Sequence, residues 1–98
     1  ITKLNNQPVF LFGAHIFSQF LIYLGINQKN LIGILDNSEY KEGKRLYGTK
    51  FNIFKPDYIC SFKKPNVIIF AGQYQNEIEK QIGKINENSK IIGPKLFN

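Results

Sequence analysis

The sequence predicts an α/β domain of three layers, in which helices cover both faces of a four-stranded parallel sheet. Short apolar runs at 9–12, 31–35 and 66–70 have the length and continuity of parallel strands buried on both faces. Segments 16–24 and 74–85 carry apolar residues at helical spacing. Because strands and helices alternate along the chain, the strands are expected to run parallel, connected by crossover helices.

The first element is a buried strand over 9–12, followed by the turn Gly13-Ala14-His15. Glycine permits backbone conformations that other residues resist, so Gly13 suits a tight turn between strand and helix. The following helix, over 16–24, would point its first N–H groups at whatever lies above the carboxyl end of the strand.

The second strand, 31–35, ends in Asp36-Asn37, and the short β-α-β unit requires a right-handed crossover. Residues 37–52 contain glycines and charges without periodicity, so they are expected to form a loop anchored by Tyr47 and Phe51. A short helical turn is expected at Pro56, since proline suits a first helical position.

The last part of the chain predicts a strand over 66–70, a helix over 74–85 and a short strand over 90–92. The expected spatial order of the four strands is 2-1-3-4. The turns at 13–15 and 71–73 would then flank one crevice at the topological switch point. Open α/β sheets usually bind ligands at this place.

Composition limits the classes of function. The 98 residues are 43% hydrophobic and 14% aromatic, which favours one folded domain over 1–98 and argues against disorder. Apolar runs are far shorter than a membrane span of about 20 residues. The net charge of +6 comes from scattered basic residues, all but one of them lysine, without a nucleic-acid-binding motif. We therefore expect neither a nucleic-acid nor a membrane partner.

Two residue types bear on context. The chain has no methionine, which favours a C-terminal or internal piece of a longer protein. Its single cysteine, Cys60, excludes an internal disulfide and fits a reducing cytoplasm. The apolar neighbourhood of Cys60 predicts a buried structural thiol.

The crevice matches a dinucleotide site in part. Gly13 takes the first glycine position of the G-x-G-x-x-G fingerprint, and Asp36 ends the second strand where a ribose-binding carboxylate would lie. His15 and Ser18 occupy the second and third glycine positions. NAD(P) binding and a cofactor-free scaffold in which Asp36 caps a loop both remain open. His15 is either a donor to a phosphate or sugar or a plain surface residue.

Three stretches of the chain together resemble a known family. They are Phe12-Gly13-Ala14, the segment IGILDNSEYKEGKRLYGT at 32–49, and the segment VIIFAGQYQNEI at 67–78. The chain resembles the C-terminal Rossmann-like domain of sugar C-methyltransferases that depend on S-adenosylmethionine (SAM). The middle stretch is the most specific, because Lys41, Gly43, Gly48 and Thr49 all fall in register with the family's pattern.

The resemblance implies a longer enzyme with a zinc-binding region and a central SAM domain, both outside this chain. That enzyme would methylate a carbon of a nucleotide-linked sugar in polysaccharide or glycan synthesis. This domain would bind the nucleotide-sugar substrate and pack on the neighbouring methyltransferase domain, with no catalytic residue, metal ligand or cofactor of its own. The candidate binding residues are Gly13, Ala14, His15, Asp36, Asn37, Gly72 and Tyr74.

The departure at His15, where the family has glycine, puts a phosphate-binding role of that turn in question. Two alternatives stay open. One is an NAD(P)-binding domain of a nucleotide-sugar epimerase or dehydratase, which a similar Gly13 turn and Asp36-Asn37 pair also resemble. The other is a noncatalytic interaction domain in which the Rossmann-like shape serves only as a scaffold.

Overall fold

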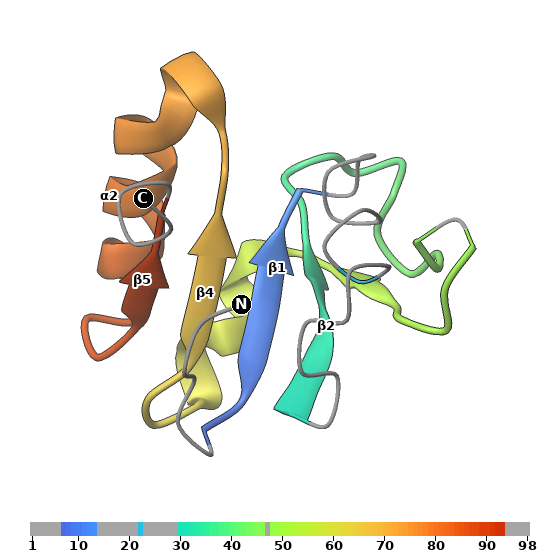
Figure 1. The fold of residues 1–98 in the computed structure, drawn as a ribbon, viewed down its shortest axis with the longest axis horizontal. Coiled ribbons are helices and arrows are strands. Elements are labelled where there is room, and N and C mark those ends of the chain that lie inside the picture. Colours follow the sequence, from blue (N-terminus) through green and yellow to red (C-terminus); the bar gives the residue numbers. More distant parts are fainter. Residues whose placement is uncertain (1–6, 14–21, 23–29, 47, 94–98) are drawn as a thin grey trace.

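The computed structural model describes residues 7–13, 22, 30–46 and 48–93. Its centre is a parallel sheet of five strands in the order β3-β2-β1-β4-β5 (Figure 1). The strands are β1 Val9–Phe12, β2 Leu31–Leu35, β3 Ile53–Phe54, β4 Asn66–Ile69 and β5 Lys90–Ile92. The α/β class and the parallel arrangement predicted from the sequence are confirmed.

The prediction of four strands was wrong in number, although the four lie beside one another in the expected order. The fifth strand, β3, adds to the outer edge of β2, where Ile53 pairs with Ile34 and Phe54 with Leu35. The sequence predicted a loop over 37–52 and a helical turn at Pro56, with no strand between them. Two residues are too few to show strand periodicity, so the sequence pattern could not predict this strand. The strand expected over 66–70 also ends one residue earlier, at Ile69.

Backbone hydrogen bonds organise much of the expected loop into a hairpin. Gly43 N donates to Ile53 O at 2.9 Å, Ile53 N donates to Lys44 O at 2.7 Å, and Leu46 N donates to the carbonyl of Phe51 at 2.9 Å. Leu46 and Phe51 are both buried, so the expected anchoring by Phe51 is confirmed. The other expected anchor, Tyr47, lies outside the described residues.

Three helical segments are described: η2 Pro56–Ser61, η3 Gly72–Tyr74 and α2 Gln75–Ile85. The helical turn expected at Pro56 is confirmed as the 3-10 helix η2. The helix expected over 74–85 is confirmed as α2, which begins one residue later and follows a single 3-10 turn. The helix expected over 16–24 lies outside the described residues, apart from Ile22.

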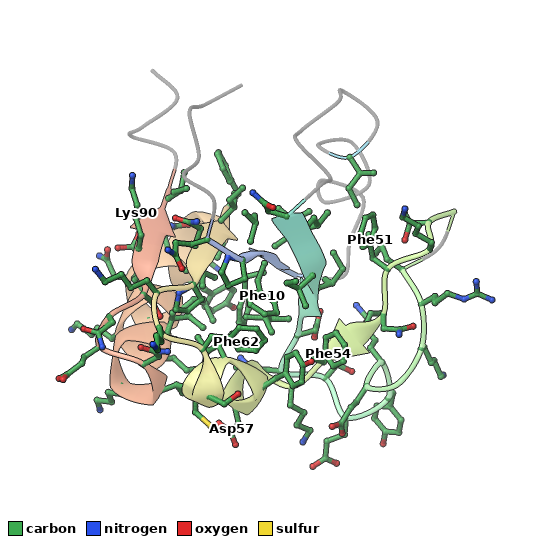
Figure 2. The ribbon with its side chains drawn as sticks, turned by 90° about the horizontal axis from the view of Figure 1, so that it is seen from below. Phe10, Phe51, Phe54, Asp57, Phe62 and Lys90 are labelled. Carbon is green, nitrogen blue, oxygen red and sulfur yellow. The ribbon has the colours of Figure 1, made fainter. Side chains whose placement is uncertain are left out.

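Both η2 and α2 cover the same face of the sheet (Figure 2). On this face Phe10, Leu35, Val67 and Ile69 pack against Ile59 of η2 and Ile82 of α2. The opposite face buries alternate strand residues together with side chains of the hairpin: Val9, Leu11, Ile34, Ile53, Ile68 and Ile92, with Leu46 and Phe51. Burial on both faces explains why the strands read as continuous apolar runs.

The buried side chain of Asn86 ties η2 to the end of α2. Its Nδ2 donates to Ile59 O at 2.9 Å and to Phe62 O at 2.6 Å, and its Oδ1 accepts from Asn88 N at 3.0 Å. Ile59 lies in the last turn of η2, where its carbonyl also accepts from Phe62 N at 3.1 Å, and Phe62 directly follows the helix. The Asn86 side chain therefore joins the end of α2 to the end of η2.

Four aromatic rings pack between the sheet and η2, and we call them the aromatic cluster: Phe10, Phe54, Tyr58 and Phe62 (Figure 2). The Tyr58 ring stacks on Phe54 with centroids 4.1 Å apart, while Phe62 meets Phe10 edge to face at 5.2 Å. Tyr58 faces the core only in part, because 42% of it stays exposed.

The expected burial of Cys60 was wrong: its thiol is exposed. The reason is the geometry of η2, because a 3-10 helix has three residues per turn and aligns residues i and i+3. Pro56 and Ile59 share the side that faces the sheet and are buried. Cys60, one residue further on, turns outward.

Candidate functional site

A hollow of about 350 Å³ opens at the carboxyl ends of β1 and β4, between these strands and the start of α2. It lies at the predicted switch point, since β1 pairs with β2 on one side and with β4 on the other. Its lining comes from four separate parts of the chain: Phe12, Gly13, Asp36, Phe70, Ala71, Tyr74 and Ile78. The crevice expected from the strand order is therefore present.

Gly13 ends β1 and forms part of the wall. Its φ of 105° lies in the region that side chains resist, so glycine is needed for the turn. Its N–H donates to Leu35 O at 2.6 Å, which ties the turn to the end of β2. Ala14 and His15, the other predicted residues of this turn, lie outside the described residues.

Asp36 lines the hollow immediately after β2. Its carboxylate is largely buried, with 15% of the side chain exposed, and Oδ1 accepts from Ser38 N at 2.8 Å. Lys41 Nζ lies 3.9 Å from Oδ2. Asp36 thus caps the following turn, as one of the two interpretations expected, and it also presents a carboxylate to the hollow.

Two predicted residues do not line the hollow. Asn37 instead forms a reciprocal amide pair with Gln81 of α2: its Nδ2 donates to Gln81 Oε1 at 3.1 Å, and Gln81 Nε2 donates to its Oδ1 at 2.8 Å. This pair joins the segment after β2 to α2. Gly72 is exposed and has a φ of 57°, so it serves the turn into η3 rather than the lining.

Tyr74 lines the hollow and remains 54% exposed, so its ring is available to a ligand. It ends η3, where its N–H donates to Ala71 O at 3.0 Å. The sequence analysis missed Phe12, Phe70 and Ile78 as site residues, because their apolar spacing indicated core positions. The signal that could have found them is their place at the carboxyl ends of strands or in the first turns of the following helix.

The electrostatics of the lining are simple. Among the lining residues that the structure describes, Asp36 alone carries a charge at neutral pH. Within the described residues, no group of three or more histidine, cysteine, aspartate or glutamate side chains could hold a metal ion. No helix in this part of the chain is both long and apolar enough to cross a bilayer. The part of the lining that the structure describes is therefore apolar apart from the Asp36 carboxylate.

A family model described as the C-methyltransferase C-terminal domain matches residues 2–94. The chain belongs to this family. The resemblance drawn from the three sequence stretches is thus confirmed. A C-methyltransferase C-terminal domain is part of a larger methyltransferase chain, which provides it with a neighbouring domain. Searches of curated proteins and of solved structures found no match to this chain.

Proposed function

We propose that this C-methyltransferase C-terminal domain binds the nucleotide-linked sugar substrate of a SAM-dependent enzyme and packs against the neighbouring methyltransferase domain. The observation that supports this is the convergence of Gly13, Asp36 and Tyr74 on one hollow at the switch point. These residues follow β1, β2 and β4, so the fold brings together groups that are distant in sequence. The setting we propose is polysaccharide or glycan synthesis in the cytoplasm.

The chemistry of the lining suits an uncharged, hydroxyl-bearing part of the substrate. The Asp36 carboxylate can accept hydrogen bonds from sugar or ribose hydroxyls. The exposed ring of Tyr74 offers a flat apolar surface, and Phe12 and Ile78 lie around the same hollow. Among the lining residues that the structure describes, Asp36 alone is charged, so we propose that the phosphates lie away from its carboxylate.

The role of the domain is positioning. Holding the sugar in one orientation converts the encounter of two molecules into a reaction within one complex, which can lower the barrier by roughly 7–11 kcal/mol in favourable cases. SAM would supply the methyl group on the neighbouring domain. We place the zinc ligands that the resemblance implies in the rest of the enzyme, since the described residues offer no such cluster.

Steady-state kinetics of the full methyltransferase chain test this proposal. Asp36→Ala and Tyr74→Ala should raise the KM for the sugar substrate, by roughly tenfold for Asp36, because a hydrogen bond to a charged group contributes about 1.5–3 kcal/mol. The affinity for SAM should stay unchanged. Tyr40→Ala is the matched control, since Tyr40 is 86% exposed and does not line the hollow. Wild-type KM values for both variants would refute the proposal.

A second candidate is NAD(P) binding, favoured by one observation. Gly13 and Asp36 occupy two positions of the dinucleotide fingerprint, and both line the same hollow. His15 and Ser18 replace the remaining glycines, and a Cβ at position 15 hinders the close approach of a pyrophosphate. We therefore expect NAD and NADP to bind weakly or not at all in calorimetry. Micromolar binding of either would favour the dinucleotide function over sugar binding.

A further inference from the structure

We infer that Gln75 is a positioning residue. Its side-chain carboxamide takes the place of a strand residue beside the end of β4 and holds Phe70 and Ala71, which form one wall of the hollow. The inference rests on the proposed function, because it assigns to Gln75 an effect on the affinity of that same site. Gln75 is the first residue of α2 and is not among the residues that line the hollow. Its influence would therefore pass through the backbone of other residues.

The carboxamide of Gln75 makes three short hydrogen bonds. Its Oε1 accepts from Ala71 N at 2.8 Å, and its Nε2 donates to Ile69 O at 2.9 Å. The same Nε2 donates to Glu79 Oε2, one turn further along α2, at 2.7 Å. All of these contacts are partly buried, so the amide is held from three sides and water competes with them only weakly.

This pattern reproduces the bonding of a parallel strand. In a parallel pair, the residue opposite position i donates to the carbonyl of i−1 and accepts from the N–H of i+1. The Gln75 amide does both around Phe70, since it donates to Ile69 O and accepts from Ala71 N. A side chain thus bonds to β4 as an added strand residue would.

The sequence of β5 explains why a substitute is needed. Ile92 pairs with Ile68, so continuing the register would place position 94 opposite Phe70. That residue is Pro94, which has no N–H to donate. Gly93 leaves room for the replacement, because a Cβ there would lie 3.0 Å from Gln75 Nε2 and 3.3 Å from Glu79 Oε2.

The bonded segment is the wall of the hollow. Phe70 and Ala71 line it, and the chain leads from them through η3 to Tyr74. In Figure 1 the chain continues beyond β4 before it turns into α2, and this is the stretch that Gln75 holds. Without the carboxamide, Ile69 O and Ala71 N lose these bonds, and the segment that lines the hollow loses this attachment to α2.

The test uses the full methyltransferase chain with Gln75→Met and Gln75→Glu. Methionine keeps the length of the side chain and removes all three bonds. Glutamate keeps an acceptor for Ala71 N, loses the donor to Ile69 O, and faces the Glu79 carboxylate. Gln73→Met and Gln73→Glu are the matched controls, because Gln73 lies in the same turn, is exposed and does not line the hollow.

Three quantities are measured for each variant: the Kd for UDP-glucose, dTDP-glucose, GDP-mannose and CDP-glucose by calorimetry, the Kd for SAM, and hydrogen exchange in peptides covering 69–74. Both Gln75 variants should speed exchange in these peptides and weaken binding of the accepted nucleotide sugar about tenfold, with SAM binding unchanged. The Gln73 variants should change neither. Gly93→Ala should act in the same direction as Gln75→Met with a smaller effect, because its Cβ displaces the carboxamide.

The outcomes separate the two proposals. Faster exchange with an unchanged Kd for the nucleotide sugar, or unchanged exchange in Gln75→Met, overturns the inference and leaves the proposed function standing. If the wild-type chain binds none of the four nucleotide sugars, or if Asp36→Ala and Tyr74→Ala bind them normally, the proposed function fails and the inference fails with it. Loss of SAM binding in Gln75→Met would show general unfolding and would also overturn the positioning role.

Discussion

Phe10 and Phe12 are two phenylalanines of one strand, and they have different surroundings. Both side chains belong to the face of the sheet that carries η2 and α2. Phe10 is fully buried, with the rings of Phe62 and Tyr58 at 5.2 and 6.0 Å. Phe12, two residues nearer the carboxyl end, is partly exposed and lines the hollow. The same residue type thus becomes core where η2 covers the strand and part of the lining of a hollow where the strand runs beyond it.

The aromatic cluster and the hollow also share one structural device. In each, a side-chain amide bonds to backbone groups where a regular element ends. Asn86 binds two carbonyls at the end of η2, and Gln75 binds the carbonyl of Ile69, the last residue of β4, and the N–H of Ala71. Their surroundings differ: Asn86 lies beside a covered core, whereas Gln75 bonds to the segment that lines the hollow.

The largest expected effect comes from truncating the two phenylalanines. Phe10→Ala should destabilise the chain by about 3–5 kcal/mol, because it removes a fully buried ring from the aromatic cluster. Phe12→Ala should cost less than half as much, since part of its ring is already in water. Urea denaturation measures both, with the slope compared to confirm two-state unfolding. Equal losses would show that the hollow is as much a part of the core as the cluster.

A smaller effect separates two tyrosines of similar exposure. Tyr58→Ala should cost about 1–2 kcal/mol, because the ring loses its stacking on Phe54 and its contacts with Phe10 and Phe62. Tyr74→Ala should change the free energy of unfolding by less than about 0.5 kcal/mol, as for most surface positions. Thermal and urea unfolding can compare them directly. A large loss for Tyr74→Ala would mean that its ring supports the fold and is not reserved for a ligand.

The third substitution, Gly33→Ala, is expected to affect the aromatic cluster and not the hollow. At Gly33 a Cβ would lie 2.5 Å from the Phe54 ring and 2.9 Å from Asn52 O, a backbone atom that cannot move freely. Gly33→Ala should therefore cost about 1–3 kcal/mol by overpacking the β3 side of the aromatic cluster. Substrate affinity of the folded enzyme should stay the same, because Gly33 and Phe54 do not line the hollow. Gly83→Ala is the control, since a Cβ at Gly83 meets no atom within 4 Å.

Much of the described fold could be predicted from local patterns. The apolar runs of β1, β2 and β4 and the helical spacing of α2 reflect burial on both faces of a sheet and on one face of a helix. Strand β3 could not be found in this way, because two residues are too few to show a strand pattern. Its place beside β2 depends on tertiary pairing and on the backbone hydrogen bonds that join Ile53 to Gly43 and Lys44. The exposure of Cys60 depended on the 3-10 form of η2, which apolar neighbours do not reveal.

The position of the hollow could be predicted from the sequence, whereas the residues that line it could be predicted only in part. Strand order located the crevice, and Gly13, Asp36 and Tyr74 do line it. Asn37 was expected there for the same reason as Asp36, yet its side chain pairs with Gln81, a residue 44 positions away. Such a long-range pair depends on how α2 crosses the sheet, and one sequence does not contain that information.

By itself, the sequence determined the α/β class, the order of four strands, the turn at Gly13 and, through its motifs, the methyltransferase family. Each of these can be recognised from short stretches of sequence: the apolar runs, the helical spacing, the glycine turn and the family motifs. Only the tertiary structure decided that Phe10 is core while Phe12 lines the hollow, and that the Gln75 side chain bonds to the end of β4. Those outcomes depend on which element lies over which part of a strand, because coverage by neighbours, and not residue type, determines what meets solvent.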